Sequence, residues 1–301
     1  MNAIELSHVT KHFPGFTLQD LSLTVPSGTI CGLVGENGAG KSTTIRLLMG
    51  ALRPDSGTCT VLGADSAAPE FLSLKEDIGV VLDEAYFPES LNALQVGGVM
   101  AKTYRRWDGK QYQNYLTRFG LPEKKPFKDF SRGMKMKLAI AVALSHSPRL
   151  LVLDEATAGL DPIVRDEVLE IFNEFTREED HSILISSHNL RELEDVCDHV
   201  GIMHKGKIIV ERSLSDLQGN VSKIQVAFQE GMPTLPKDFE ILHMSNTGRV
   251  YTLIVKGNPE RAKMILEETH PMLIDILPLT LEEIFIYEMG GKNYEIKDIL
   301  F

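Results

Sequence analysis

The stretch GENGAGKS at residues 35–42 constrains the fold of this 301-residue chain more than any other feature. It matches the pattern G-x-x-x-x-G-K-[ST], follows an apolar run at 30–34 and precedes a run of helix formers at 41–52. Glycines in this pattern let backbone N–H groups surround phosphates at the start of a helix. The context therefore predicts a phosphate-binding loop in an α/β fold, with Lys41 reaching the β and γ phosphates and Ser42 binding Mg²⁺.

Short apolar runs and turn residues alternate in the rest of the first eighty residues. Strands are expected at 4–13, 18–26 and 29–35. Two later apolar runs, at 149–155 and 181–188, flank a helical pattern at about 162–178. A strand, a helix and a strand in this order predict a βαβ unit within a parallel sheet.

The pattern of expected strands and helices changes near residue 215. Residues 1–215 are expected to form the phosphate-loop domain, with a more helical segment at about 84–147, and residues 216–301 a small α+β appendage. In the appendage, strands are expected at about 221–229, 238–244 and 249–256, a turn at 245–248 and a helix at about 258–269. Thr280 and Glu283 have the spacing of a capping box at the start of a last helix.

Two carboxylates end the apolar run at 150–155. Asp154 stands at the carboxyl end of the expected strand, where ligands bind in open α/β sheets. It could therefore be a direct ligand of Mg²⁺ or contact a ligand of that ion. Glu155 is then the candidate that orients and deprotonates an attacking water. His188 ends the next apolar run and would face a γ-phosphate, although a histidine at a strand end is more often an ordinary surface residue.

Composition limits the classes of partner. The formal net charge of −11 argues against broad nucleic-acid binding, although a local basic patch would survive it. Cys31, Cys59 and Cys197 show no metal or redox spacing and are expected to fill core positions. No signal-peptide pattern begins the chain, and the longest apolar runs are far shorter than the roughly 20 residues that span a bilayer.

One helix start carries an unusual charge pattern. In KDFSRGMKMKLAIA (128–141), Ser131 is a good N-cap for a helix that runs on to the next proline. Arg132, Lys135 and Lys137 lie in its first turns, where each cation costs roughly 0.3–1 kcal/mol because the helix end is already positive. Either surface residues tolerate this cost or the helix start faces an anion, and the segment alone leaves both readings open.

Several linked segments resemble ABC-type ATPases. GENGAGKST, FSRGM (130–134), LLVLDEATAGLDP and SSH occur in the order and spacing of that family, and the resemblance covers roughly residues 3–213. It implies an ABC-type P-loop fold with a helical subdomain at about 84–147 that hydrolyses ATP with Mg²⁺. It also implies that two such domains pair head to tail, so that the helix start at Ser131 faces the γ-phosphate of ATP held by the other copy.

The resemblance assigns roles position by position. The nucleotide contacts would be Phe13, Gly35, Asn37, Gly38, Ala39, Gly40, Lys41, Ser42 and Thr43. The contacts across the pair of domains would be Ser131, Arg132, Gly133, Met134 and Asp161. Glu155, His188 and Lys41 would be catalytic, and Ser42, Asp83 and Asp154 would hold Mg²⁺. Phe13 matches the aromatic residue that stacks on adenine, with Phe16 as a nearby competitor.

The chain departs from the family pattern in two places. FSRGM differs from LSGGQ at Phe130, Arg132 and Met134, although S-[KR]-G-M resembles a variant of bacterial exporter-type ATPases. Asp83 stands where most members carry glutamine; it still offers oxygen to a hard cation but adds negative charge beside the carboxylate pair. Neither departure removes a catalytic position, so hydrolysis is predicted.

Three functions are compatible with such an ATPase. The first, which we favour, is the subunit that powers a separate integral-membrane permease from the cytoplasmic face, as a homodimer or a heterodimer with a similar ATPase. The segment at about 84–105 would then receive the permease's coupling helix, with Tyr86, Phe87 and Tyr104 either contacting it or packing in the subdomain core. The ending LTLEEIFIYEMGG resembles exporter ATPases, which favours export of a drug, peptide or lipid-like substrate over import.

The other two functions do not involve transport. A soluble ABC protein acting on ribosomes or DNA usually carries two ATPase domains or long coiled coils, whereas this chain has one P-loop and no heptad run. A regulatory module that holds ATP without turnover would not need intact Lys41, Asp154, Glu155 and His188. No nucleic-acid partner is expected.

Overall fold

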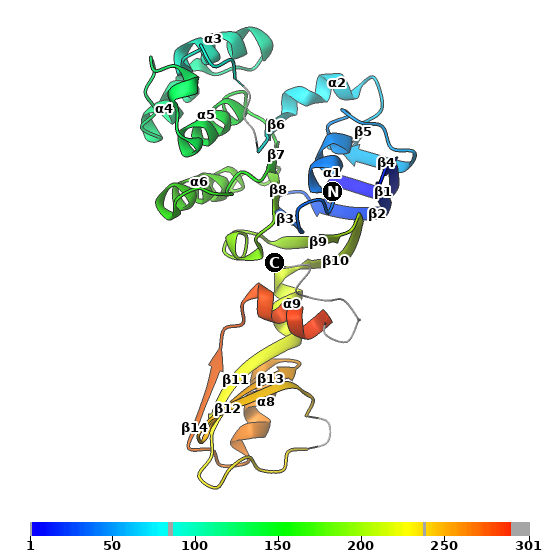
Figure 1. Cartoon of the computed structure of the whole chain (residues 1–301), viewed down its shortest axis with the longest axis vertical. Coiled ribbons are helices and arrows are strands. Elements are labelled where there is room, and N and C mark those ends of the chain that lie inside the picture. The colour runs from blue at the N-terminus through cyan, green and yellow to red at the C-terminus, as the bar shows by residue number, and fades with distance from the viewer. Residues whose placement is uncertain (1, 84–86, 237–238, 290–301) are drawn as a thin grey trace. The chain divides into compact units, whose positions relative to one another are not determined.

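The structure, a computed structural model, describes residues 2–83, 87–236 and 239–289 (Figure 1). The chain divides into two compact units, Met1–Glu211 and Arg212–Phe301. This division falls four residues before the boundary at 215 that the sequence suggested.

A six-stranded sheet forms the centre of the first unit, in the order β10-β9-β3-β8-β7-β6. Its strands are β3 (Ile30–Val34), β6 (Ile78–Val81), β7 (Leu150–Asp154), β8 (Ser182–Ser187), β9 (His199–His204) and β10 (Lys207–Ser213). β7, helix α6 (Pro162–Phe175) and β8 form the expected βαβ unit, and β7 and β8 pair in parallel. Every residue of β3, β7 and β8 is buried, as expected for a parallel sheet covered on both faces.

A four-stranded antiparallel sheet packs in the same unit, in the order β2-β1-β4-β5. Its strands are β1 (Asn2–Phe13), β2 (Phe16–Pro26), β4 (Ser56–Val61) and β5 (Ala64–Asp65). Helix α1 (Lys41–Leu48) follows the phosphate loop and buries Ile45, Leu47 and Leu48 in a core shared with both sheets. It ends four residues before the predicted limit of 52, and the chain turns at Gly50, whose φ is 64°.

The helices of the expected helical segment gather beside the parallel sheet in Figure 1. They are α3 (Ala93–Thr103), α4 (Gly109–Arg118), α5 (Arg132–Leu144) and the short η2 (Phe127–Asp129). Outside this segment, short turns of helix occur at α2 (Phe71–Leu74), η1 (Lys75–Asp77) and η3 (Leu190–Glu192). Ser131 caps α5 as predicted, because its Oγ accepts the backbone N–H of Met134 at 3.3 Å. The helix buries every residue from Met136 to Leu144, so it forms the centre of the helical layer.

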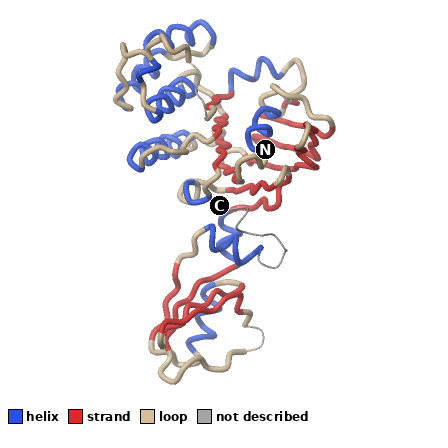
Figure 2. The backbone as a smooth tube through the Cα atoms, viewed as in Figure 1, coloured by secondary structure: helices blue, strands red, loops and turns tan. Residues whose placement is uncertain are grey.

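The second unit is an antiparallel sheet with helices, as the red strands and blue helices of Figure 2 show. Its elements are α7 (Leu214–Asn220), β11 (Val221–Ala227), β12 (Ile241–Thr247), β13 (Val250–Lys256), α8 (Pro259–Glu267), β14 (Leu273–Leu277) and α9 (Leu281–Met289). The strand order is β12-β13-β11-β14, and its core contains Ile224, Val226, Leu253 and Leu266.

The predicted turn at 245–248 was wrong. β12 begins three residues later than expected and continues through Thr247, so the turn falls at residues 248–249. Gly248, with a φ of 63°, supplies the left-handed backbone that the turn needs. The predicted capping box was confirmed: the N–H of Thr280 donates to Glu283 Oε2 at 3.0 Å and the N–H of Glu283 to Thr280 Oγ1 at 3.2 Å.

The sequence also led to expectations about the three cysteines and about membrane-spanning segments. Cys31, Cys59 and Cys197 form no disulfide and are buried, and burial raises the thiol pKa of Cys31 to about 12 and of Cys59 to about 11. Core filling therefore accounts for them. Within residues 2–83, 87–236 and 239–289, no helix has the length and apolar character to cross a bilayer.

Candidate functional site

The phosphate loop takes a backbone path that two of its glycines make possible. Gly40, at the start of α1, has a φ of 114°, and a Cβ there would lie 2.5 Å from a methyl carbon of Leu18. A Cβ on Gly35 would collide with the carbonyl oxygen of Met203. The loop is thus packed against β2 and β9 on one side and leaves the α1 N-terminus open on the other, where an anion is stabilised.

A pocket of about 410 Å³ opens at this helix start. It is lined by Phe16, Asn37, Gly38, Gly40, Lys41, Ser42, Thr43, Asp83 and Glu155. The structure therefore brings most of the predicted loop residues together with carboxylates that follow β6 and β7. Gly35 and Ala39 do not line it, because Gly35 packs against β9 and Ala39 is buried in the core.

Lys41 and Glu155 meet inside this pocket. The side chain of Lys41 is only 6% exposed; its Nζ donates to the carbonyl of Gly35 at 2.6 Å and lies 3.2 Å from Glu155 Oε1. The other oxygen of Glu155 lies 2.7 Å from Nδ1 of His188. The three predicted catalytic side chains thus form one chain of contacts, which joins the phosphate loop to the ends of β7 and β8.

Ser186, a residue that the sequence did not single out, holds the carboxylate of Asp154 and the backbone of Glu155. Its Oγ donates to Asp154 Oδ1 at 2.6 Å and accepts the backbone N–H of Glu155 at 3.1 Å. Asp154 is buried, and Glu155 has a φ of 52°, a left-handed conformation that is unfavourable for a residue other than glycine. The available sequence signal for Ser186 was a hydroxyl directly after the apolar run Ile183–Ile185 of a buried strand.

Of the two aromatic candidates for adenine stacking, Phe16 lines the pocket. Its ring lies 3.0 Å from where a Cβ of Gly40 would stand. The ring of Phe13 lies 6.5 Å from that of Phe16, centroid to centroid, and is more than one-third exposed. The assignment of Phe13 remains a prediction, and the geometry brings its competitor nearer to the phosphate loop.

The two departures from the family pattern contact each other. Nη2 of Arg132 lies 3.1 Å from Oδ1 of Asp83, and a Cβ on Gly159 would lie 2.7 Å from the Arg132 guanidinium. In this single chain Arg132 therefore reaches back toward the pocket of its own copy. Asp161 caps α6 by accepting the N–H of Val164 at 3.1 Å.

The other cations at the start of α5 also have local partners. Nζ of Lys137 lies 2.6 Å from Glu167 Oε2, and Nζ of Lys135 lies 5.1 Å from the ring centroid of Phe127. These contacts offset part of the cost of placing positive charge at a helix start. The roles of Ser131, Arg132, Gly133 and Met134 toward a second copy stay predictions.

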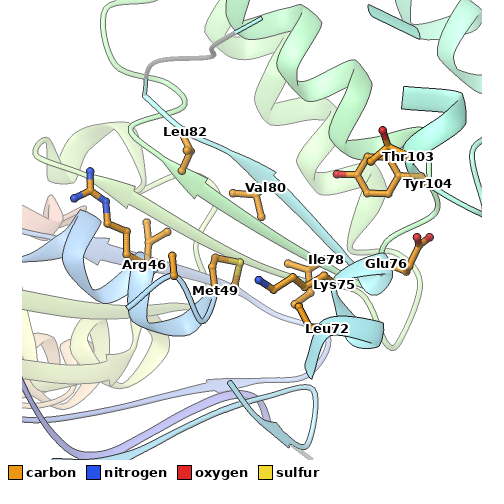
Figure 3. Close-up of a pocket in the computed structure, with 12 residues that line it drawn as sticks. Arg46, Met49, Leu72, Lys75, Glu76, Ile78, Val80, Leu82, Thr103 and Tyr104 are labelled. Carbon is orange, nitrogen blue, oxygen red and sulfur yellow. The ribbon is translucent and has the colours of Figure 1, made fainter. Parts of the chain in front are cut away.

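A second, apolar groove of about 430 Å³ lies beside α1 and β6 (Figure 3). It is lined by Ile45, Arg46, Met49, Ala51, Leu72, Lys75, Glu76, Ile78, Val80, Leu82, Thr103 and Tyr104. Leu72 is 71% exposed, and Val80 and Leu82 are also exposed. Most of its wall precedes the segment at 84–105 in which the sequence placed a partner groove.

The aromatic residues proposed for that groove have different surroundings. Tyr104 lines it while stacking on His146, with ring centroids 4.0 Å apart. Phe87 packs edge-on against Phe127, at 5.5 Å between centroids, as a subdomain core residue does. Tyr86 lies outside the described residues.

The sheet and the pocket define an α/β P-loop protein, and comparison with known proteins narrows the class. Residues 18–158 match the ABC transporter family. The chain is 31% identical over 291 residues to the ABC transporter ATP-binding protein YtrB of Bacillus subtilis (strain 168), covering 96% of this chain and 99% of that protein. It is 34% identical over 309 residues to the bacitracin transport ATP-binding protein BcrA of Bacillus licheniformis, covering 96% and 97%.

A solved structure of the ATP binding subunit of an ABC transporter superposes with a TM-score of 0.65 at 27% identity, over 72% of this chain and 92% of that chain. The chain belongs to the ABC transporter ATP-binding proteins. It binds ATP and is an ATP-hydrolysing enzyme.

Proposed function

We propose that this chain is the ATP-hydrolysing subunit that powers a separate integral-membrane permease in export, working as a homodimer or a heterodimer with a similar ATPase. The observation that carries the proposal is the pocket in which the phosphate loop meets Glu155 and, through it, His188. The name of the bacitracin transport relative supports a role in transport, and the substrate we propose is drug, peptide or lipid-like. The chain would work at the cytoplasmic face of the membrane, held there by the permease.

The residues divide the chemistry among them. The N–H groups of the loop and the Lys41 ammonium would bind the β and γ phosphates of ATP. Glu155 would accept a proton from the attacking water, which requires its carboxylate to leave Lys41 for the water. His188, in contact with Glu155 at 2.7 Å, would hold that carboxylate and face the γ-phosphate. Positioning and electrostatics would supply most of the rate enhancement.

The side chains around the pocket fit Mg²⁺. Ser42 and Asp83 line it, and Asp154, whose Oδ1 accepts the Ser186 hydroxyl, keeps a second carboxylate oxygen. Hydroxyl and carboxylate oxygens are the donors this cation prefers, and it usually keeps several waters and substrate phosphates as ligands. That preference agrees with the finding that the described residues contain no group of three or more acidic, His or Cys metal ligands. When bound, Mg²⁺ would neutralise charge on the β and γ phosphates.

The apolar groove supports the permease as partner. Leu72, Val80 and Leu82 expose apolar surface along it, and Arg46 and Lys75 stand among them (Figure 3). An amphipathic helix with an apolar face and acidic residues beside that face would complement such a groove. A cytoplasmic helix of the permease is the segment we assign to it.

Two other functions are less well supported. The net charge of −11 disfavours a role on ribosomes or DNA. The contacts among Lys41, Glu155 and His188 argue against a regulatory module that holds ATP without hydrolysing it.

Affinity purification of the tagged chain from detergent-solubilised host membranes tests the proposal. A hydrophobic, multi-span chain should copurify in near-equal amount. Leu72→Asp in the groove should lose that chain and keep the ATPase activity of the isolated subunit. Leu273→Asp, at another exposed leucine, in the second unit, should retain the chain. Recovery with ribosomes and without a membrane chain would refute the transporter role.

A further inference from the structure

One carboxylate behind the pocket has contacts that the predicted roles do not use. Glu192 ends the short helix η3, which follows β8. Its Oε2 accepts the hydroxyl of Thr157 at 3.0 Å and the hydroxyl of Ser187 at 3.1 Å. Thr157 and Ser187 are both fully buried, so a lost acceptor would leave a buried hydroxyl unpaired, which is unfavourable.

The two hydroxyls belong to the two segments that carry the catalytic candidates. Thr157 lies two residues after Glu155, and Ser187 immediately precedes His188. A single carboxylate oxygen thus connects the loop after β7 with the end of β8. Ser187 Oγ also accepts the backbone N–H of Asn189 at 3.0 Å, which fixes this hydroxyl from its other side.

Both catalytic candidates need such support. Glu155 has a φ of 52°, and a residue in a sparsely populated backbone region is strained and persists only when its surroundings hold it there. The side chain of His188 is 49% exposed, so packing alone does not set its position. The 2.7 Å contact between Glu155 and His188 therefore depends on how the two backbone segments are held relative to each other.

We propose that Glu192 is a positioning residue for ATP hydrolysis, which acts by clamping the loop after Glu155 to the strand end before His188. The inference rests on the roles proposed above for Glu155 and His188. Glu192 does not line the phosphate pocket, so its removal should weaken the chemical step and leave nucleotide binding intact.

The decisive experiment measures kcat, the KM for Mg-ATP and the melting temperature for Glu192→Ala, with and without His188→Ala. The expected result is a fall in kcat of about tenfold, with KM changed less than about twofold, and no further fall when His188 is already absent. Equal fold-losses in both backgrounds, or a loss that appears in KM, would overturn the proposal. If His188→Ala alone leaves kcat unchanged, the role proposed for His188 fails instead, whatever Glu192 does.

A matched pair at Thr157 provides a test that does not depend on the fold tolerating Glu192→Ala. Thr157→Val keeps the shape and removes the hydroxyl, whereas Thr157→Ser keeps the hydroxyl that Glu192 accepts. Thr157→Val should reproduce the loss of kcat at unchanged KM, and Thr157→Ser should stay near the parent. A valine variant as active as the serine variant would contradict the clamp.

Discussion

Asp83 has two competing partners at the edge of the phosphate pocket. It lines that pocket, yet its carboxylate is paired with Arg132 at 3.1 Å. Both side chains are about half exposed, so the pair is worth little to stability and can break readily. If Asp83 contributes oxygen to Mg²⁺, Arg132 has to release it first.

This competition predicts opposite effects of two substitutions on the Mg²⁺ dependence of turnover. Arg132→Ala should lower the Mg²⁺ concentration that gives half-maximal ATPase rate, because Asp83 is then freed. Asp83→Gln should raise it, since an amide oxygen is a weaker ligand than a carboxylate. Titrations with Mg²⁺ at saturating ATP measure both, with Arg53→Ala, another exposed arginine, as control. Superimposable curves for all variants would leave Asp83 without a role at the cation.

Glu155 allows a second prediction at the scale of one residue. Glu155→Gln keeps the shape of the side chain but cannot accept the proton of the attacking water, and general-base catalysis contributes roughly 10²–10⁴-fold. Single-turnover rates should fall by about that factor while equilibrium ATP binding is retained. A variant that hydrolyses ATP at the parental rate would exclude Glu155 as the base.

At the scale of elements, the helix caps are local and can be tested singly. Thr280→Ala removes the hydroxyl that accepts the N–H of Glu283 at the start of α9, which should cost about 1 kcal/mol. Hydrogen exchange of the Glu283 amide should then be roughly five times faster. Thr280→Ser keeps the oxygen and should exchange like the parent; if both variants exchange alike, the cap does not hold this helix end.

The helices and strands also show which features could be predicted from the sequence. Ser131 and the pair Thr280–Glu283 cap helices within three residues, so their signals are local and were recognised. The predicted limits of β12 were wrong at its start: the predicted range includes Phe239, which packs against the core of the second unit without joining the ladder. An apolar residue indicates burial, and burial does not require strand pairing.

The residues of the candidate site also fall into two groups, those with a local sequence signal and those without one. Glycine, lysine and serine of the phosphate loop follow from a motif, and so do the strand-end carboxylates. Ser186 and Glu192 act through contacts that join segments about 30 residues apart or more, at Asp154 and Thr157. Asp83 and Arg132 are 49 residues apart and were recognised only as separate departures. No local pattern encodes such pairs, since they depend on how the sheet aligns its strand ends.

At the scale of the whole molecule, a buried histidine should make stability depend on pH. His146 is fully buried, stacks on Tyr104 and has Nδ1 3.1 Å from the carbonyl oxygen of Glu76. Burial lowers the pKa of His146 below its ordinary value of 6.5. The unfolded chain therefore binds a proton at a pH where the folded chain does not, and stability falls as pH drops below about 6.5.

The measurement is the denaturation free energy of the first unit between pH 8 and 5. A single proton contributes a slope of at most about 1.4 kcal/mol per pH unit. His146→Gln should be less stable at pH 8, because a buried stacking ring is lost, and should show a shallower slope below pH 6.5. Parallel curves for parent and variant would mean that other groups produce the acid sensitivity.

A second question at the scale of the whole molecule is whether one chain holds a complete catalytic site. The phosphate pocket contains loop residues, Asp83 and Glu155 of this chain, and no residue of the segment 130–134 lines it in the described structure. If two copies pair head to tail, each site takes its phosphate loop and Glu155 from one copy and Ser131 from the other. Complementation between inactive variants distinguishes this arrangement from a self-sufficient chain.

Ser131→Arg and Lys41→Ala should each be inactive alone, and a mixture should regain activity because one site of each mixed dimer is intact. With random pairing at equal amounts, half of the dimers are mixed, so about a quarter of the parental rate is expected. Lys41→Ala mixed with Glu155→Gln is the matched control: both changes fall in the same half-site, so no intact site forms and no activity returns. Recovery in the control, or none with Ser131→Arg at any ratio, would contradict sites shared between copies.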